Sequence, residues 1–162
     1  MNHDEAFAGW AREHSPELLR RATMLCGDRH RAEDLVQETL VRMFLRWRHI
    51  DLDGNPIAYA HTTLFRVFLS GRRKHSSSEL VSDNLPERSA GEVDPAVRLD
   101  LVAALQTLPP RQRLVVVARY LDDLSVTEVA AVMHRSEAWV RVNAHRALLK
   151  LRDSPFMAMS HL

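Results

Sequence analysis

The sequence contains little of what disulfide-bonded, zinc-binding and membrane proteins require. Its one cysteine, Cys26, excludes an internal disulfide and a cysteine-based zinc site. No apolar run is longer than that at residues 114–118, which is far shorter than the roughly 18 residues of a membrane-spanning helix. The first residues also lack the basic and apolar segments of a signal peptide. We therefore expect a cytoplasmic protein with no membrane insertion.

Signatures of catalysis are also absent from the sequence. The 9 histidines are scattered along the chain without an HExxH pair, and no glycine-rich phosphate loop is present. The sequence therefore predicts a protein that is not an enzyme, with no catalytic residues, no metal site and no cofactor.

The net charge of +1 conceals three blocks of different charge. Residues 1–75 carry 12 basic and 10 acidic side chains, residues 76–97 carry 1 and 5, and residues 98–162 carry 9 and 6. The acidic middle is rich in Ser, Gly and Pro and poor in large apolar residues, which is typical of a flexible linker. We predict two small domains, 1–75 and 95–153, joined by an acidic linker at 76–94 and followed by a tail at 154–162.

Apolar residues recur with helical spacing in both domains, and no stretch alternates as a half-buried strand does, so we predict an all-α fold. In the first domain one helix ends at Gly27 and Asp28 caps the next. A loop is expected at 49–55, after which Asn55 and Pro56 begin another helix. The helix after Asp28 has a predicted apolar stripe of Val36, Leu40, Met43, Phe44 and Trp47.

The second domain ends in a helix-turn-helix pattern. Ser125 and Glu128 match a capping box at the start of a short helix that ends at Met133. Ser136 then caps a longer, basic helix. A short helix, a tight turn and a longer basic helix are the arrangement of many DNA-binding proteins.

Residue types that read DNA lie on the predicted outer side of this last helix, on its flanks (Arg141 and Asn143) and just before it. They are Arg135, Ser136, Trp139, Arg141, Val142, Asn143, His145 and Arg146. Arg and Asn side chains make bidentate hydrogen bonds to guanine and adenine edges, and Val contacts a thymine methyl group. The hydroxyl of Ser136 and the free amides of the first turn suit a phosphate. The residues alone leave a merely solvated surface open as the alternative.

Five motifs in a fixed order carry a resemblance to a known family: AEDLVQET at 32–39, NPIAY at 55–59, LPPRQR at 108–113, YLDDLS at 120–125 and AHRAL at 144–148. With the linker between them, they make residues 10–153 resemble an extracytoplasmic-function sigma factor of bacterial RNA polymerase. The resemblance implies that the first domain is the helical bundle of sigma region 2 and the second is the helix-turn-helix of region 4. The implied function is that of an alternative sigma factor, which directs promoter-specific transcription initiation.

The resemblance also implies where partners bind. The clamp helices of the polymerase β′ subunit would be bound by Asp34, Gln37, Glu38 and Arg42, and the β flap by region 4. The minus-ten element would be bound and melted by Ile50, Asp51, Leu52, Asp53, Tyr59, His61, Arg66, Arg72, Arg73 and Lys74. Aromatic and cationic side chains of this kind suit single-stranded DNA. The minus-thirty-five element would be read by the last helix, and an anti-sigma factor would regulate the protein.

Three positions depart from the family pattern. Arg66 stands where Asn is common, Gly71 where a bulky residue is common, and His134 at the glycine of the turn. Promoter preference therefore does not transfer from relatives. Two other functions stay open on the sequence: a sigma-like protein that sequesters an anti-sigma factor without initiating transcription, and an autonomous helix-turn-helix regulator.

Overall fold

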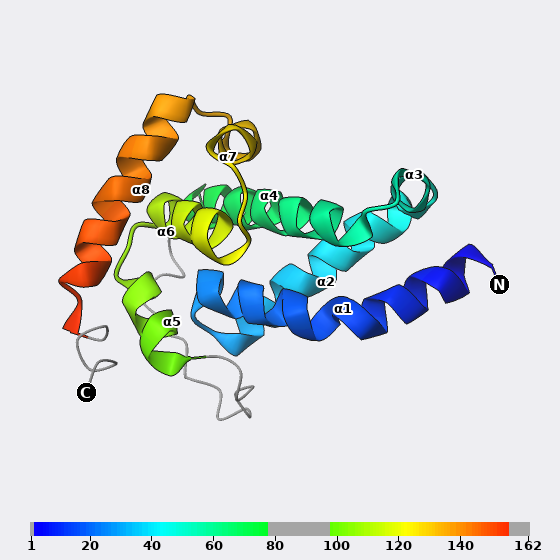
Figure 1. Cartoon of the computed structure of the whole chain (residues 1–162). Coiled ribbons are helices and arrows are strands. Elements are labelled where there is room, and N and C mark those ends of the chain that lie inside the picture. Colours follow the sequence, from blue (N-terminus) through cyan, green and yellow to red (C-terminus); the bar gives the residue numbers. More distant parts are fainter. Residues whose placement is uncertain (1, 78–97, 156–162) are drawn as a thin grey trace. The chain divides into compact units, whose positions relative to one another are not determined.

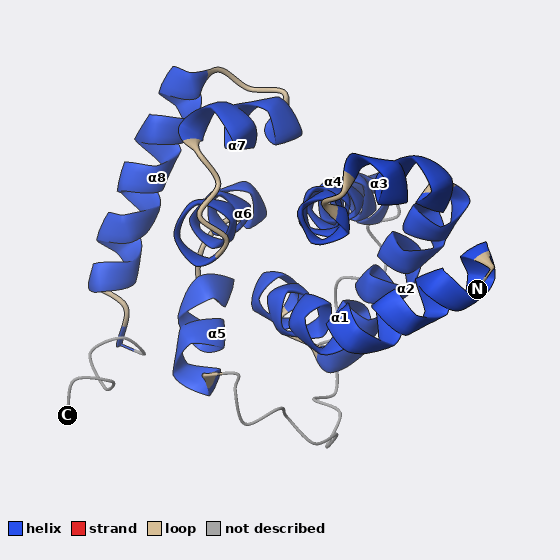
Figure 2. Ribbon diagram, turned by 45° about the vertical axis from the view of Figure 1, so that its right-hand side comes forward, coloured by secondary structure: helices blue, strands red, loops and turns tan. Residues whose placement is uncertain are grey.

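The computed structural model of the chain describes residues 2–77 and 98–155, with the side chains of 51–53 and 72–77 left out (Figure 1). Within these ranges every regular element is a helix and none is a strand, which confirms the predicted all-α class (Figure 2). The predicted linker, apart from its first two residues, and the tail from 156 onward lie outside the described ranges. In the part of the chain that is described, no helix is long and apolar enough to cross a bilayer.

The chain divides into two compact units, one of residues 1–22 with 28–91 and one of residues 23–27 with 92–162. The first unit is built from α1 (His3–Cys26) up to residue 22, α2 (Arg29–Leu45), α3 (Trp47–Asp53) and α4 (Pro56–Ser77), whereas the last turn of α1 belongs to the second unit. Its core lies where α2 packs against α4. The buried side of α2 has Ala32, Leu35, Val36, Thr39 and Met43, and that of α4 includes Ala60, Leu64, Phe65, Val67 and Phe68.

An aromatic cluster joins the start of α1 to the end of α2 and to α3. The ring of Phe7 lies 5.4 Å from that of Phe44 and 5.2 Å from that of Trp47. The rings of Trp10 and Trp47 are 5.6 Å apart, within the range of centre-to-centre distances that aromatic pairs favour. Of the predicted apolar stripe, Val36, Met43 and Trp47 are buried, whereas Phe44 stays largely exposed at the edge of this cluster.

The helix starts of the first unit follow the sequence prediction, with one correction. The Asp28 side chain accepts a hydrogen bond from His30 N at the start of α2, and Asn55 does so from Ala58 N at the start of α4. The segment predicted as a loop at 49–55 instead forms most of helix α3. The physical reason is that Trp47 and Ile50 are three residues apart. In a helix this spacing puts both side chains on the same side, where both are buried.

The second unit contains α5 (Leu99–Gln106), α6 (Pro110–Val116), a π-helical turn η1 (Val117–Leu121), α7 (Val126–Met133) and α8 (Glu137–Arg152). Both α6 and α7 pack against α8. The core between them is formed by Leu114, Val115, Val117, Val129, Val140, Ala144 and Ala147. The π-helical turn was not predicted from the sequence.

A buried arginine anchors this unit. The Arg113 guanidinium on α6 donates hydrogen bonds to the carbonyl oxygens of Leu105 and Leu108, at 3.0 Å each, and of Leu25 at 2.6 Å. These carbonyls lie at or just beyond the ends of α5 and α1, where helices leave acceptors without an internal partner. Arg113 therefore caps two helix ends from within the core, where its charge is also stabilised by the helix dipoles.

The turns on either side of α7 have the predicted caps. Ser125 Oγ accepts from Glu128 N and the Glu128 carboxylate accepts from Ser125 N, so the capping box is confirmed. At the other end, His134 has φ 54° and ψ 45°, the left-handed region that glycine adopts most easily. This residue turns the chain from α7 toward α8.

Candidate nucleic-acid and partner interfaces

The outer side of α8 is the first candidate surface. Arg141, Val142, His145 and Arg146 are exposed along it, and Val142 keeps 46% of its surface open to solvent. The small, exposed Ala138 precedes them by one turn, so the backbone of α8 has room to approach a partner closely. Cationic side chains, an exposed valine and a small residue on one helix face fit the major groove of DNA.

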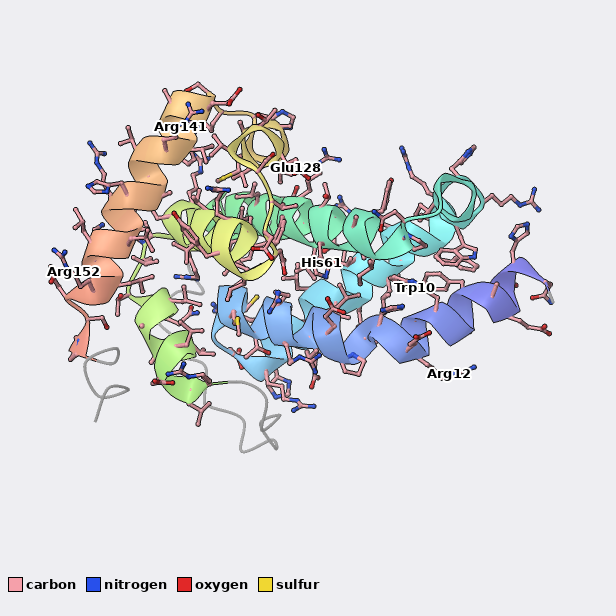
Figure 3. The ribbon with its side chains drawn as sticks, in the orientation of Figure 1. Trp10, Arg12, His61, Glu128, Arg141 and Arg152 are labelled. Atoms are coloured by element: carbon pink, nitrogen blue, oxygen red, sulfur yellow. The ribbon has the colours of Figure 1, made fainter. Side chains whose placement is uncertain are left out.

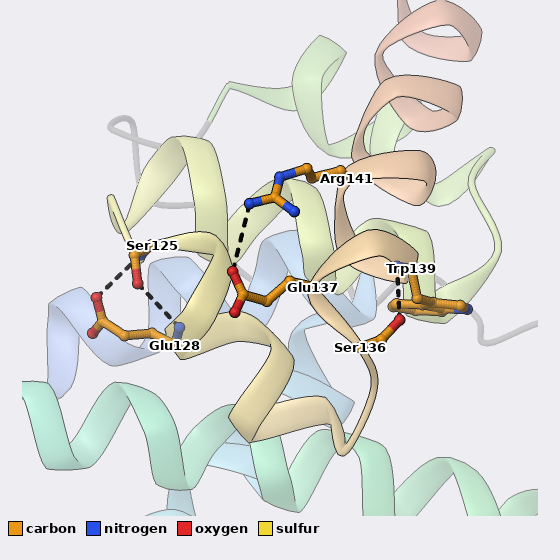
Figure 4. A network of polar contacts seen from close by, with 6 residues as sticks. All are labelled: Ser125, Glu128, Ser136, Glu137, Trp139 and Arg141. Atoms are coloured by element: carbon orange, nitrogen blue, oxygen red, sulfur yellow. Dashed lines mark hydrogen bonds and ion pairs between the residues drawn. The ribbon is translucent and has the colours of Figure 1, made fainter.

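The start of α8 is held by contacts among its own residues. Ser136 Oγ accepts from Trp139 N at 3.0 Å, and Arg141 lies 3.5 Å from Glu137 (Figure 4). The Arg135 guanidinium lies 5.3 Å from the centre of the Trp139 ring, which is half-buried. Arg135, through its contact with Trp139, and Arg141 (Figures 3 and 4) are thus two cationic groups at the amino-terminal end of the exposed face.

Asn143 has different surroundings from the other residues of the predicted DNA-reading set. Only 9% of its surface is exposed, and its Nδ2 donates to Trp139 O at 2.9 Å. Its Oδ1 accepts a hydrogen bond from Gln112 on α6. The residue lies at the edge of the buried face of α8 rather than on its outer side, and its amide is used within the protein.

Side chains of α4 form the second candidate surface. Tyr59 is half-buried and Arg66 is exposed; because seven residues separate them, they share one face of the helix. Arg72, Arg73 and Lys74 belong to the last turns of α4, and their side chains lie outside the described part. An aromatic ring followed by basic residues on one helix is a pattern that suits single-stranded nucleic acid.

Two residues of the predicted minus-ten set have other surroundings than expected. Ile50 is 1% exposed and belongs to the core of the first unit, because it lies on the buried side of α3 together with Trp47. His61 has 12% of its side chain exposed, and its Nε2 lies 3.2 Å from Glu17 Oε1 on α1 (Figure 3). Asp51, Leu52 and Asp53 lie in α3, and their side chains are not described.

The outer face of α2 is the third candidate surface. Asp34, Gln37, Glu38 and Arg42 are all exposed there, and Arg42 forms an ion pair of 3.1 Å with Glu38. The opposite face of the helix is buried against α4. The four predicted residues are thus brought together on one accessible side.

Sequence reasoning missed two apolar residues on this face. Val41 is 58% exposed and Leu45 is 76% exposed. Positions 34, 38, 41 and 45 are separated by four, three and four residues, so the four side chains lie in one stripe along the helix. This spacing could have indicated from the sequence that Val41 and Leu45 belong to the outer face. The outer face of α2 is therefore polar and acidic in its first half and apolar in its second half.

Clusters that could bind a metal are not found among the described residues, where no group of three His, Cys, Asp or Glu side chains converges. The described surfaces are suited to binding through charge, hydrogen bonds and apolar contact.

Comparison with known proteins identifies two family regions in this chain. The sigma-70 region 2 family matches residues 10–78, and the sigma-70 region 4 family matches residues 98–151. An RNA polymerase sigma-E factor of Streptomyces avermitilis is 32% identical over 160 residues, covering 94% of this chain and 88% of its own. An ECF RNA polymerase sigma factor, SigF, of Caulobacter vibrioides is 34% identical over 84% of this chain and 75% of its own.

A solved structure has a similar fold. The sigma factor RpoE of Bartonella quintana, crystallised in complex with the anti-sigma factor NepR, aligns with a TM-score of 0.70 and 24% sequence identity. The alignment covers 92% of this chain and 96% of that chain.

Proposed function

This chain belongs to the extracytoplasmic-function sigma factors of the sigma-70 family, and on that premise we propose how its two units share the work. It is a non-enzymatic subunit that binds core RNA polymerase and directs transcription initiation at specific promoters. In this proposal residues 1–75 are region 2, residues 95–153 are region 4, and residues 76–94 link them. The protein then acts in the cytoplasm, where the polymerase meets the chromosome.

Region 2 binds core polymerase through the outer face of α2. The acidic Asp34 and Glu38 would be repelled by DNA phosphates, so this face suits a protein partner. The exposed Val41 and Leu45 extend the polar stripe with apolar surface, which strengthens docking when it is removed from water. We assign this face to the clamp helices of the β′ subunit, with Asp34, Gln37, Glu38 and Arg42 as the polar contacts.

Region 4 reads the minus-thirty-five element as duplex DNA through α8. The observation that carries this half of the proposal is the exposed stripe of Arg141, Val142, His145 and Arg146 on the second helix of a helix-turn-helix. Arg135 and Ser136 lie at the start of that helix, where contacts with phosphates set its register on the duplex. The β flap is the proposed polymerase contact of this region.

The minus-ten element, once melted, is held along α4. Tyr59 supplies an aromatic surface on which a base stacks, and Arg66 supplies charge on the same face. The basic positions 72–74 continue this helix toward its end. We leave Ile50 out of the binding set, because a buried core residue has no surface to offer.

An anti-sigma factor is the proposed regulator. The complex of RpoE with NepR is a precedent for such a partner on a chain of this fold. The same regulator would be the target if this chain acted by sequestration instead, so the two functions differ in whether transcripts are made.

Run-off transcription tests the proposal. Purified chain and core polymerase are mixed with a promoter library, and transcripts are sequenced. We expect transcripts whose templates share two separated sequence elements. Asp34→Lys should weaken core binding, measured by co-elution with core polymerase, because it reverses a charge on the docking face. The matched control is Glu13→Lys, which makes the same charge change at an exposed position of α1.

Three outcomes separate the candidate functions. Library transcripts that depend on the chain support initiation. No transcript under any condition, together with tight binding of an anti-sigma factor, would favour the sequestering protein. Tight, specific binding of duplex DNA without polymerase, and no effect of Asp34→Lys, would favour an autonomous regulator.

A further inference from the structure

The buried side of α8 contains one polar side chain among apolar ones. The buried residues of this helix are Val140, Asn143, Ala144, Ala147 and Leu151. A buried amide is retained at low energetic cost only when its donors and acceptors are paired. Asn143 meets this condition through contacts on both sides of its amide group.

These contacts form a chain of hydrogen bonds between α8 and α6. Asn143 Nδ2 donates to Trp139 O at 2.9 Å, one turn earlier in α8. Gln112 Nε2, on α6, donates to Asn143 Oδ1 at 3.3 Å. Lys150 Nζ, two turns later in α8, donates to Gln112 Oε1 at 3.4 Å. A single side chain of α6 therefore contacts α8 at two points along its length.

Directional contacts of this kind restrict the helix in a way that its apolar contacts do not. Packing of Val140, Ala144 and Ala147 against α6 and α7 is non-directional and tolerates small rotations of α8 about its axis. A hydrogen bond between two amides weakens steeply as its angle departs from linearity. Rotation of α8 would break the bond between Gln112 and Asn143 and leave the buried Oδ1 of Asn143 without its partner, whereas the bond to Trp139 O lies within α8 and turns with it.

The rotation of α8 decides which side chains reach a partner. Val142 is the neighbour of Asn143 in sequence, and His145 and Arg146 follow within one turn. Their directions are therefore fixed relative to the Asn143 amide. A recognition site requires its side chains to be held to within about 0.5 Å and 10–20° of the productive geometry.

We propose that Asn143 and Gln112 are positioning residues for recognition of the minus-thirty-five element, and that neither contacts DNA. The amide pair sets the rotation of α8 on α6 and thereby the directions of Val142, His145 and Arg146. This inference rests on the proposed function of α8. It replaces the sequence-based interpretation of Asn143 as a residue that reads a base.

Holoenzyme reconstituted with Asn143→Leu, Gln112→Leu and the double variant tests the proposal. The template is the promoter that wild-type holoenzyme transcribes best from the randomised library, with every base pair of its upstream element substituted singly. Transcription from each template gives a discrimination profile. The control is Arg111→Gln, an exposed position next to Gln112 on α6.

Each single variant should reduce discrimination about three- to tenfold at several adjacent base pairs, a part of what a correct base contact confers. In the double variant, discrimination should fall by no more than in the more strongly affected single variant, because both substitutions break the same hydrogen bond. Arg111→Gln should keep the wild-type profile. Gln112 is only half-buried, so its variant carries the test if Asn143→Leu does not fold.

Two results would overturn the proposal while leaving region 4 as the DNA reader. One is a loss confined to a single base pair in Asn143→Leu and absent in Gln112→Leu, which would make Asn143 a base-contacting residue. The other is a uniform decrease at all templates with an unchanged profile, which would show an effect on folding alone. A wild-type holoenzyme without any upstream preference would instead refute the assigned function of α8, and the positioning role with it.

Discussion

Replacing His134 by glycine should stabilise the helix-turn-helix. A residue with a Cβ atom pays about 1–2 kcal/mol in the left-handed region that His134 occupies at φ 54°. Glycine avoids this cost but loses about 0.5–1 kcal/mol through the greater freedom of its unfolded chain. His134 is exposed, so little side-chain packing is lost. The expected gain for His134→Gly is therefore roughly 0.5–1 kcal/mol.

Urea unfolding followed by hydrogen–deuterium exchange of peptides from α7 and α8 measures this gain in the unit concerned. A gain of this size corresponds to a rise of about 2–8 °C in the melting temperature of a unit of 60–100 residues. His134→Ala is the matched control, because alanine keeps the Cβ atom and the strain. If His134→Gly proved no more stable than His134→Ala, the backbone conformation would not limit stability at this turn and the reasoning would be refuted.

Other substitutions test separate parts of the fold by urea unfolding with hydrogen–deuterium exchange of peptides from the element that is changed. Gly71→Ala should stabilise α4 by about 0.5–1 kcal/mol, since an added Cβ meets nothing within 4 Å; a loss would reveal a packing role for the glycine. Gly27→Ala should destabilise by about 1 kcal/mol or more, because Gly27 has φ 75°; no loss would contradict this. Ser125→Ala should cost about 1 kcal/mol by removing the cap of α7, and a neutral effect would mean that water replaces it. Arg113→Met should cost at least about 2 kcal/mol by leaving buried carbonyls unpaired; a stable variant would show that these helix ends need no cap.

Features that depend on neighbouring residues alone could be predicted from the sequence. The caps formed by Asp28, Ser125 and Ser136 are examples, because each joins a side chain to a backbone N–H two or three residues away. The all-α fold class could be predicted for the same reason, because the spacing of apolar residues is also a feature of neighbouring residues. The left-handed residue at the turn before α8 could also be anticipated, since the family pattern has glycine there.

Features that depend on distant partners could not be predicted. Asn143 was predicted to read DNA from the flank of the outer face because its residue type suits a base edge, and its partner Gln112 lies 31 residues away on another helix. Arg113 was likewise noted in the sequence only as part of the motif at 108–113. Its role as a buried cap could not be predicted, because the carbonyl oxygens that accept its hydrogen bonds lie at the ends of two other helices. Burial of Ile50 had a local signal, since it follows Trp47 at helical spacing, but the family comparison with a DNA-binding loop outweighed it. The π-helical turn at 117–121 has no sequence signature of this kind.

The tryptophans are distributed so that each unit has its own optical signal. Trp10 and Trp47 lie in contact within the aromatic cluster of the first unit, whereas Trp139 lies beside Arg135 at the start of α8. A chain in which Trp10 and Trp47 are replaced by phenylalanine would emit only from α8, and its emission should change when a phosphate draws the Arg135 guanidinium from the indole ring. The complementary Trp139→Phe chain would report on the first unit alone. Events in the first unit and duplex binding by α8 could then be followed separately, each in its own variant of the free chain and without any attached label.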